Sequence, residues 1–327
     1  MTAPALVRVD DSAVSSASEL LWRSSEPDRS GVRYEIIGPP GAPVVAVLGG
    51  ISASKHVASS ALDPSPGWWE EVVGPGKAID TRQFRVIGID YVTNGASAAP
   101  VTTTDQAEAL AAALDQAGVR CLHAVVGASY GGMIALAFGV RFAARAKRLI
   151  VISAAHDSDP IATALRHLQR RVVALGSAVG RERDGLAIAR GIAMTSYLTT
   201  QHFEERIEDC DRNDSRVVED RIGSYLKTHG EEFAERWTSE RYNALSLSLD
   251  LHRISPEKIT LPTTVIAVSG DRLVPLAQAR ELARRLGGPS QLIELDSSLG
   301  HDAFLGDASR VAPFVNELLR LRLEIAS

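Results

Sequence analysis

The sequence predicts an α/β fold built on a mostly parallel, doubly wound sheet. Near-continuous Val/Ile/Leu runs of strand length recur between turn residues, and such runs are typical of strands that are buried on both faces. Helical patterns separate several of these runs, and an alternation of strands and helices indicates a sheet covered by helices on both sides. The expected strands are residues 32–38, 43–50, 84–92, 122–129, 147–155, 263–271 and 290–298.

Three stretches between or after these strands repeat apolar residues at helical spacing: residues 104–118, 131–146 and 303–321. For the first of them, Thr104 is a candidate N-cap and Gly118 a candidate C-terminal stop. We therefore expect three helices that pack against the sheet.

The alternation stops between about Asp157 and Arg253, where the sequence is charge-dense, strand-poor and helical in pattern. This predicts a loose N-terminal arm at 1–31, a core at 32–156 and 254–327, and a helical lid at 157–253. One lid segment carries apolar residues at the spacing of a helix-packing seam: Leu165, Leu168, Val172 and Leu175. The seam either packs within the lid or forms a lid-to-lid contact in a homodimer.

Composition excludes several classes of function. The chain of 327 residues carries a formal net charge of -5, which argues against nucleic acid as the main partner. No stretch reaches the ~18 consecutive apolar residues of a membrane span, and Asp10 and Asp11 interrupt the apolar core that a secretory signal needs. We expect a cytoplasmic protein. Cys121 and Cys210 differ in context and lack CxxC spacing, so neither a disulfide nor a metal site is expected.

The strongest chemical signal is GASYGG at residues 127–132, directly after a predicted strand and before a predicted helix. In that context G-x-S-x-G is a nucleophile elbow, a tight turn that raises the serine hydroxyl above the sheet at a helix N-terminus. The elbow indicates an α/β-hydrolase fold with Ser129 as its nucleophile. Developing negative charge is favoured there by backbone N–H groups and the helix dipole.

A serine hydroxyl needs a base, and in this fold the chain order is serine, acid, histidine. His301 follows the last predicted strand, which is where the base belongs. His123 has the context of a core histidine, and His56 precedes the nucleophile. The other histidines lie in or beside the predicted lid: His156, His167, His202, His229 and His252.

The acid that orients the histidine is expected at the end of the preceding strand, where Asp271 stands in VIAVSGDRLVP. Asp250 and Asp296 are weaker candidates. An oxyanion hole needs two backbone N–H donors. Tyr130 supplies the first, and Ile51, in the loop LGGISASKHV, the second. The Gly49–Gly50 pair allows close approach there, although it is also the mark of a simple tight turn.

With these residues the chain resembles the α/β-hydrolase-type homoserine O-acyltransferases of methionine biosynthesis, and most closely a short branch that looks succinyl-CoA-using. The resemblance covers most of the chain. It is carried by GGISASKHV, GPGKAIDTRQFRVIG, TTTDQA, VVGASYGGMIAL, GLAIARGIAMTSY, SYLKTHGEEF, SGDRLVP and GHDAF. Acetyl-using members usually carry a GxxGP-type segment and a histidine-led oxyanion loop. This chain has YVTNGASAAPVTTTDQ and LGGISA at these two places. The two differences favour a succinyl donor over an acetyl donor.

The resemblance implies a substrate clamp made of Arg190 and Asp302. A zwitterion such as homoserine suits this pair, because its carboxylate favours a guanidinium and its ammonium a carboxylate. The two residues have ordinary alternatives, Asp302 as a helix N-cap and Arg190 as a solvated charge.

The expected activity is transfer of an acyl group from acyl-CoA to homoserine through an acyl-Ser129 intermediate, with acyl-CoA as a co-substrate and no bound cofactor. Candidates for binding the CoA phosphates are Arg166, Arg170, Arg171, Arg181 and Arg183, which equally suit a solvated helix face. Open alternatives are homoserine O-acetyltransfer, serine O-acyltransfer, an ester or thioester hydrolase, and a ligand-binding protein on a hydrolase scaffold. Serine lacks one methylene of homoserine, a difference of only ~1–3 kcal/mol.

Overall fold

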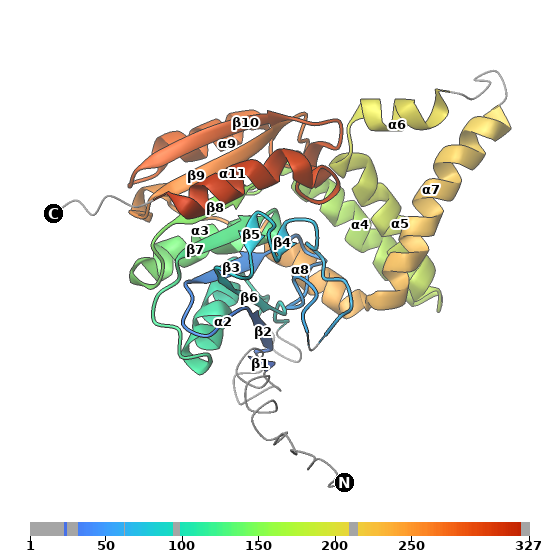
Figure 1. Cartoon of the computed structure of the whole chain (residues 1–327). Coiled ribbons are helices and arrows are strands. Elements are labelled where there is room, and N and C mark those ends of the chain that lie inside the picture. Colours follow the sequence, from blue (N-terminus) through green and yellow to red (C-terminus); the bar gives the residue numbers. More distant parts are fainter. Residues whose placement is uncertain (1–22, 25–31, 62, 94–98, 209–214, 322–327) are drawn as a thin grey trace, which may run out of the picture.

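A computed structural model describes residues 23–24, 32–61, 63–93, 99–208 and 215–321 (Figure 1). Its main feature is an eight-stranded sheet in the order β1-β2-β6-β3-β7-β8-β9-β10. The strands from β6 to β10 run parallel, and β2 pairs antiparallel with both β1 and β6. The strands are β1 Arg23–Ser24, β2 Tyr34–Ile37, β3 Val44–Leu48, β6 Arg85–Ile89, β7 Ala124–Ala128, β8 Leu149–Ile152, β9 Thr263–Ser269 and β10 Ser290–Asp296; a small second sheet pairs β4 Val73–Gly74 with β5 Ile79–Asp80.

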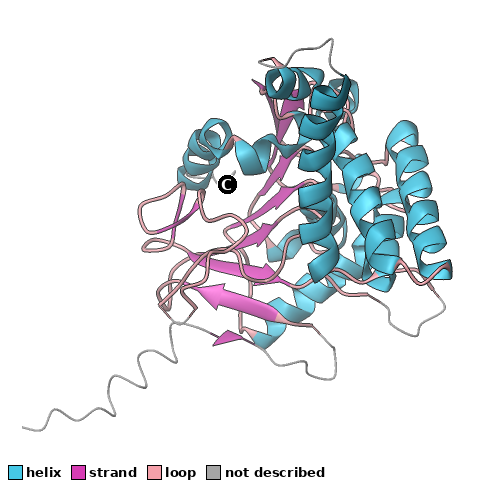
Figure 2. Cartoon of the chain, turned by 90° about the vertical axis from the view of Figure 1, so that its right-hand side faces the viewer, coloured by secondary structure: helices cyan, strands magenta, loops and turns pink. Residues whose placement is uncertain are grey.

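Alternate residues of the central strands feed two separate cores, because successive side chains point to opposite faces of a sheet. In β3, Ala46 lies in one core and Val45 and Val47 in the other. Helices α2 (Thr103–Gln116), α3 (Tyr130–Arg141) and α9 (Leu276–Arg285) contribute to the first core, and α11 (Ala308–Arg320) to the second. Helices therefore cover both faces of the sheet (Figure 2), and the predicted α/β architecture with a mostly parallel, doubly wound sheet is confirmed.

Between β8 and β9 the described chain forms five α-helices, of which α4 to α7 lie together on one side of the molecule (Figure 1). We refer to them as the inserted helices: α4 Pro160–Ala178, α5 Glu182–Tyr197, α6 Thr200–Ile207, α7 Ser215–Arg236 and α8 Ser239–Asp250. They enclose a small core of their own, which includes Val173, Leu186 and Phe233. They fall within the predicted lid at 157–253, and their action as a lid stays a prediction.

The insertion leaves and rejoins the sheet at neighbouring points. Asp157 and Arg253 form an antiparallel bridge, and their side chains make an ion pair of 3.1 Å. The N–H of Ile254 also donates to the carbonyl of His156 at 2.9 Å. The two ends of the insertion are therefore tied together.

Two expectations about helix ends were wrong. Thr102, not Thr104, is the N-cap of α2, because its hydroxyl accepts from the Asp105 N–H while the Asp105 carboxylate accepts from the Thr102 N–H. This reciprocal capping box satisfies two of the free backbone donors at a helix start. The helix expected at 303–321 is two helices, α10 (Ala303–Gly306) and α11, because Asp307 leaves the helical region with φ -129 and ψ 45.

The N-terminal arm is not loose throughout, since Arg23 and Ser24 pair with β2 as strand β1. The rest of residues 1–31 lies outside the described chain, as does Cys210; Cys121 is an exposed free thiol. Within the described ranges, no helix is long and apolar enough to cross a membrane.

Candidate active site

Ser129 occupies a sharp turn between β7 and α3. Its backbone adopts φ 54 and ψ -120, a left-handed conformation that is costly for a residue with a side chain. Gly131 permits the turn, because a Cβ at that position would lie 2.2 Å from the Leu48 carbonyl oxygen. The turn has the geometry of the nucleophile elbow that the sequence motif predicts.

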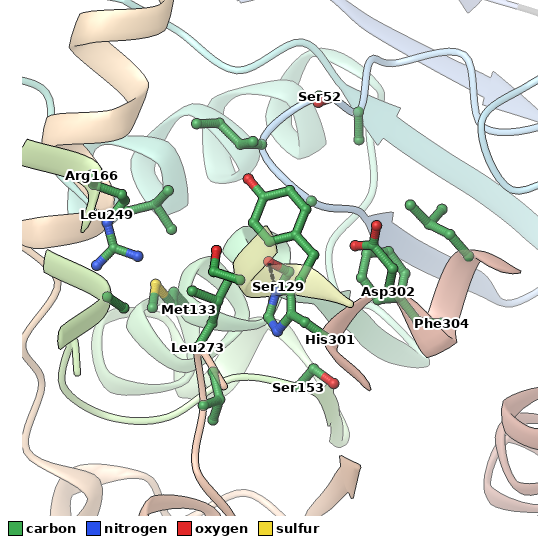
Figure 3. Close-up of a pocket in the computed structure, with 18 of the residues that line it drawn as sticks. Ser52, Ser129, Met133, Ser153, Arg166, Leu249, Leu273, His301, Asp302 and Phe304 are labelled. Carbon is green, nitrogen blue, oxygen red and sulfur yellow. Dashed lines mark hydrogen bonds between the residues drawn. The ribbon is translucent and has the colours of Figure 1, made fainter. Parts of the chain in front are cut away.

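His301 and Asp271 complete a hydrogen-bonded chain with Ser129. Ser129 Oγ lies 2.7 Å from His301 Nε2 (Figure 3), although 172 positions separate the two residues. His301 Nδ1 lies 2.8 Å from Asp271 Oδ2. Asp271 follows β9, and its other oxygen accepts from the N–H groups of Leu273 and Val274, both at 2.9 Å. The three predicted residues therefore meet at the carboxyl ends of β7 and β9 and in the loop after β10.

The electrostatics of this chain stabilise a protonated His301. Burial of the ring disfavours the charged form, but the Asp271 charge and hydrogen bond, with a further contribution from Asp302, outweigh it and raise the pKa of His301 above 6.5. His301 and Asp271 are 4% and 5% exposed, so bulk water screens this interaction little. A raised pKa suits a base that must accept the serine proton.

The rival histidines and acids have other partners. His123 Nε2 faces the Leu319 carbonyl, as its core context suggests, and His252 lies between Thr103 and the Ala155 carbonyl. Asp296 accepts from the Ser269 hydroxyl at 2.6 Å. The Asp250 carboxylate forms ion pairs with Arg166 and Arg170.

The loop after β3, residues 49–56, lies against Ser129, and we call it the oxyanion loop. The Gly49 carbonyl accepts from the Gly131 N–H at 2.8 Å and from the Tyr91 hydroxyl at 2.6 Å. Within the described part of the chain, the N–H groups of Ile51 and Tyr130 donate to no protein acceptor. These are the two donors that the sequence predicts for an oxyanion hole, and both are free to bind an oxyanion.

A cavity of about 260 Å³ opens above Ser129 and His301. Arg190, Tyr197 and Asp302 line it. Figure 3 shows Asp302 with other lining residues: Ser52, Met133, Ser153, Arg166, Leu249 and Phe304. The structure thus brings the predicted substrate clamp to the same space as the predicted nucleophile. Tyr197 was not singled out by the sequence reasoning. The signal for it was its position seven residues after Arg190, two turns along the same face of α5.

Arg190 is not a solvated charge. Its guanidinium lies over the rings of Tyr197 and Phe233, 5.2 and 5.5 Å from their centroids, and no carboxylate in the described ranges lies within ion-pair distance. Asp302 stands at the start of α10, but its carboxylate makes no capping hydrogen bond. Burial raises the pKa of Asp302, while His301 and Arg190 oppose that rise.

Two of the candidate phosphate-binding arginines are held elsewhere. Arg166 and Arg170 share the buried carboxylate of Asp250, at 2.6 Å each, and Arg166 also donates to the Ser158 hydroxyl. Arg166 is 8% exposed and lines the cavity, so it does not lie on a solvated helix face. Two guanidinium groups facing one carboxylate leave an excess of positive charge beside the cavity. Arg171, Arg181 and Arg183 are exposed.

Comparisons with known proteins agree with this geometry. The family model described as alpha/beta hydrolase fold matches residues 43–308. The crystal structure of esterase E22 superposes with a TM-score of 0.79 at 23% identity and covers 91% of this chain and 99% of its own, which shows the fold. The class of protein is therefore that of the α/β-hydrolase fold.

Two curated relatives narrow the class. The chain is 44% identical, over 90% of its length and 80% of the relative's, to a homoserine O-succinyltransferase from Xanthomonas campestris pv. campestris. It is 33% identical, over 91% of its length and 95% of the relative's, to a serine O-succinyltransferase from Litchfieldella anticariensis. The chain belongs to the homoserine and serine O-acyltransferase family of α/β hydrolases.

Proposed function

We propose that this protein is an L-homoserine O-succinyltransferase that carries the acyl group on Ser129. One observation supports the proposal most: a cationic Arg190 and an acidic Asp302 line the cavity that holds the Ser129–His301 pair. A neutral ester gains nothing from such a pair, whereas an amino acid presents a carboxylate and an ammonium group to it. The product of this reaction belongs to methionine biosynthesis.

In the first half-reaction, His301 takes the Ser129 proton as Ser129 Oγ attacks the thioester carbon of acyl-CoA. The N–H groups of Ile51 and Tyr130 stabilise the tetrahedral oxyanion. The C–S bond then breaks, the imidazolium returns its proton to the sulfur, and CoA leaves as its thiol. Asp271 acts as the acid that holds the His301 ring and stabilises its charge.

In the second half-reaction, Arg190 binds the homoserine carboxylate and Asp302 its ammonium group. His301 deprotonates the side-chain hydroxyl as this hydroxyl attacks the acyl-serine carbon. The bond between that carbon and Ser129 Oγ then breaks, and the His301 imidazolium returns its proton to Ser129. Transfer prevails over hydrolysis only when the acceptor hydroxyl is held in line and water is excluded. In this proposal the inserted helices act as a lid that excludes water from the site.

A succinyl donor adds a distal carboxylate to the acyl chain. Arg166 and Arg236 are the other arginines that line the cavity in the described chain; Arg236 is exposed and Arg166 is buried, and we propose that Arg166 binds this carboxylate. Its position supports the assignment, because Asp250 already has Arg170 as a second partner. Acyl-CoA is a co-substrate and not a bound cofactor. Its phosphates lie outside the small cavity, where Arg171, Arg181 and Arg183 are candidate cations.

We also propose a cytoplasmic protein that forms a homodimer through the inserted helices, and the surface of α4 supports the dimer. Leu168 and Leu175, two members of the predicted seam, are 56% and 64% exposed; Ile161 on the same helix and Val179 directly after it are 68% and 70% exposed. The other two seam members, Leu165 and Val172, are half-buried. An apolar row of this length on a soluble surface is typical of an interface with another protein.

The test is a matrix of two donors, succinyl-CoA and acetyl-CoA, against two acceptors, homoserine and serine, with Ser129→Ala as the blank. We expect turnover with homoserine, preference for succinyl over acetyl, and loss of essentially all activity in the blank. Turnover mainly with acetyl-CoA or with serine assigns the corresponding acyltransferase activity instead. Steady CoA release that is indifferent to the acceptor identifies a hydrolase, and no reaction of Ser129 with a serine-reactive phosphonate identifies a ligand-binding protein.

A further inference from the structure

A second histidine–carboxylate pair joins the end of the oxyanion loop to β2, away from the Ser129–His301 chain. His56 Nδ1 is 3.1 Å from both carboxylate oxygens of Glu35, a residue of β2. The side chains are 17% and 5% exposed. On the other side of the ring, His56 Nε2 is 2.9 Å from the Ser65 carbonyl oxygen. The mechanism above gives this pair no role.

The contacts of the ring favour a hydrogen on each of its nitrogens. A carbonyl oxygen only accepts hydrogen bonds, so the Ser65 carbonyl favours a hydrogen on Nε2; the Ser65 hydroxyl, 3.3 Å from Nε2, donates to Asp63 Oδ1. Nδ1 faces a carboxylate, and this contact is attractive only when Nδ1 or the carboxyl group is protonated. When the pair loses a proton, one of the two contacts becomes repulsive: either the Nδ1 lone pair faces the negative charge of Glu35, or the Nε2 lone pair faces the Ser65 carbonyl.

His56 is the last residue of the oxyanion loop, which also carries Ile51. The backbone of residues 55–57 crosses β6 at Gly88, where a Cβ would lie 2.3 Å from the Lys55 carbonyl oxygen. Three other contacts hold the loop: the Lys55 N–H donates to Asp90 at 2.9 Å, the Trp68 indole donates to the Ser54 carbonyl at 3.1 Å, and the Gly49 carbonyl accepts from Tyr91. The Tyr91 hydroxyl can also titrate, but burial raises its pKa well above 10. The His56–Glu35 contact is the one among these that depends on a histidine proton.

We propose that His56 is a positioning residue for the oxyanion hole. Through the proton it shares with Glu35 it fastens the oxyanion loop to β2 and so aims the Ile51 N–H at the acyl carbonyl. This inference rests on the proposed acyl-serine chemistry. Both half-reactions pass through an oxyanion, and the first can be measured by itself because it needs no homoserine.

The charges around the pair favour retention of the shared proton at neutral pH. Burial raises the pKa of Glu35, against the opposing effects of His56 and of Lys55. Burial lowers the pKa of His56, but the Ser65 carbonyl, Glu35 and Asp63 outweigh it, and the net shift is upward. Asp63 Oδ2 lies 3.7 Å from Nδ1. The pair therefore keeps its proton to a higher pH than a free histidine does, and the fastening is lost as the pH rises through the pKa of the pair.

The experiment measures the rate of Ser129 acylation in the full-length protein. Succinyl-CoA is mixed with enzyme in the absence of homoserine, and the burst of free CoA is followed by rapid quench from about pH 6 to about pH 10. The variants are His56→Ala, which removes the ring, and Glu35→Gln, whose amide can donate to a neutral Nδ1 at any pH. His123→Gln is the matched control, because His123 is also a half-buried histidine on a carbonyl but precedes β7, at the far end of the strand from Ser129.

We expect His56→Ala to acylate about tenfold to a hundredfold more slowly at neutral pH, since displacement of a catalytic group by about 1 Å costs up to about a hundredfold. The wild-type rate should decrease on the alkaline side, and that decrease should be absent in Glu35→Gln. His123→Gln should follow the wild-type profile.

A folded His56→Ala protein that acylates at the wild-type rate would overturn the positioning role. The shared proton is excluded if the wild-type rate does not fall by about pH 10, or if Glu35→Gln shows the same alkaline decrease. Glu35→Gln decides the matter even where His56→Ala does not fold. Failure of the proposed function has a different signature, which is a wild-type enzyme that releases no burst of CoA.

Discussion

Ser129 and Ser153 are the two non-glycine residues in the described ranges with positive φ, 54 and 47, and both line the cavity. Such backbone angles cost on the order of 1–3 kcal/mol each and persist where surrounding structure enforces them, often at functional sites. For Ser129 the elbow explains the strain. The Ser153 hydroxyl is buried without a hydrogen-bond partner, so it is available to a polar atom of a bound substrate.

At the same scale, the pKa of His301 sets the acidic limb of the pH profile. The base must be neutral, and its pKa is raised above 6.5, mainly because the Asp271 charge outweighs the cost of burial. We expect kcat/KM for succinyl-CoA to fall as the pH falls, with a midpoint above 6.5. Asp302→Asn should lower that midpoint, because it removes a negative charge that favours the imidazolium. A midpoint below 6.5 in the wild-type enzyme would contradict this assignment.

We expect Arg166 to determine the preference of the enzyme for succinyl-CoA over acetyl-CoA. In Arg166→Met, Asp250 keeps Arg170 as its partner, so the fold survives while the cavity loses a cation. We expect kcat/KM for succinyl-CoA to fall at least about tenfold, the size of one charge-assisted hydrogen bond, and that for acetyl-CoA to change less than about threefold. Arg171→Met, an exposed arginine on the same helix, is the control. Equal losses with both donors would show that Arg166 does not contact the succinyl carboxylate.

At the scale of elements, the sequence located the strands and the elbow because local patterns determine them. Ser129, Asp271 and His301 could be nominated since each follows a strand in the chain order of this fold. The Arg166–Asp250 contact could not be found in this way. It joins residues 84 positions apart, on α4 and α8, and depends on how the inserted helices pack. The break at Asp307 was hidden by apolar spacing that continues across it.

The exposed apolar row of α4 makes a prediction about assembly. Leu168→Glu with Leu175→Glu places two charges in the proposed interface, where they would be buried without partners. We expect the wild-type protein to have about twice the 35.0 kDa mass of one chain in light scattering, and the double variant to have the mass of one chain. Leu321→Glu, an exposed leucine beyond α11, should leave the mass unchanged. A wild-type monomer at all concentrations would refute the dimer.

At the scale of the whole molecule, His252 links α2 to the loop after β8. Its Nδ1 accepts from the Thr103 hydroxyl at 2.8 Å, and its Nε2 donates to the Ala155 carbonyl at 3.1 Å. Both contacts use a neutral ring. Burial lowers the pKa of His252 to about 4, from 6.5 in the unfolded chain. The unfolded state therefore binds more protons between these values, and stability is complete above pH 6.5 and declines as the pH falls toward 4.

This linkage amounts to about 2 kcal/mol of unfolding free energy between neutral pH and about pH 5. We expect urea denaturation of His252→Gln to show a pH dependence that is shallower by about that amount than the wild type. The control is His167→Gln, since His167 is an exposed histidine of α4. Parallel curves for wild type and His252→Gln would mean that the ring is already charged in the folded state.

The bridge between Asp157 and Arg253 has a consequence for how this architecture can diversify. A segment that departs from a scaffold and returns at one point can be lengthened, shortened or exchanged while the register of β8 and β9 is preserved. Ser129, Asp271 and His301 all lie outside that segment, whereas Arg166 and Arg190 lie within it. The groups that make and break bonds thus lie outside the insertion, whereas two of the three groups proposed to bind substrate charges lie within it and the third, Asp302, does not. We expect a graft of residues 158–252 from a related enzyme to change the choice of acyl donor and leave the acyl chemistry in place.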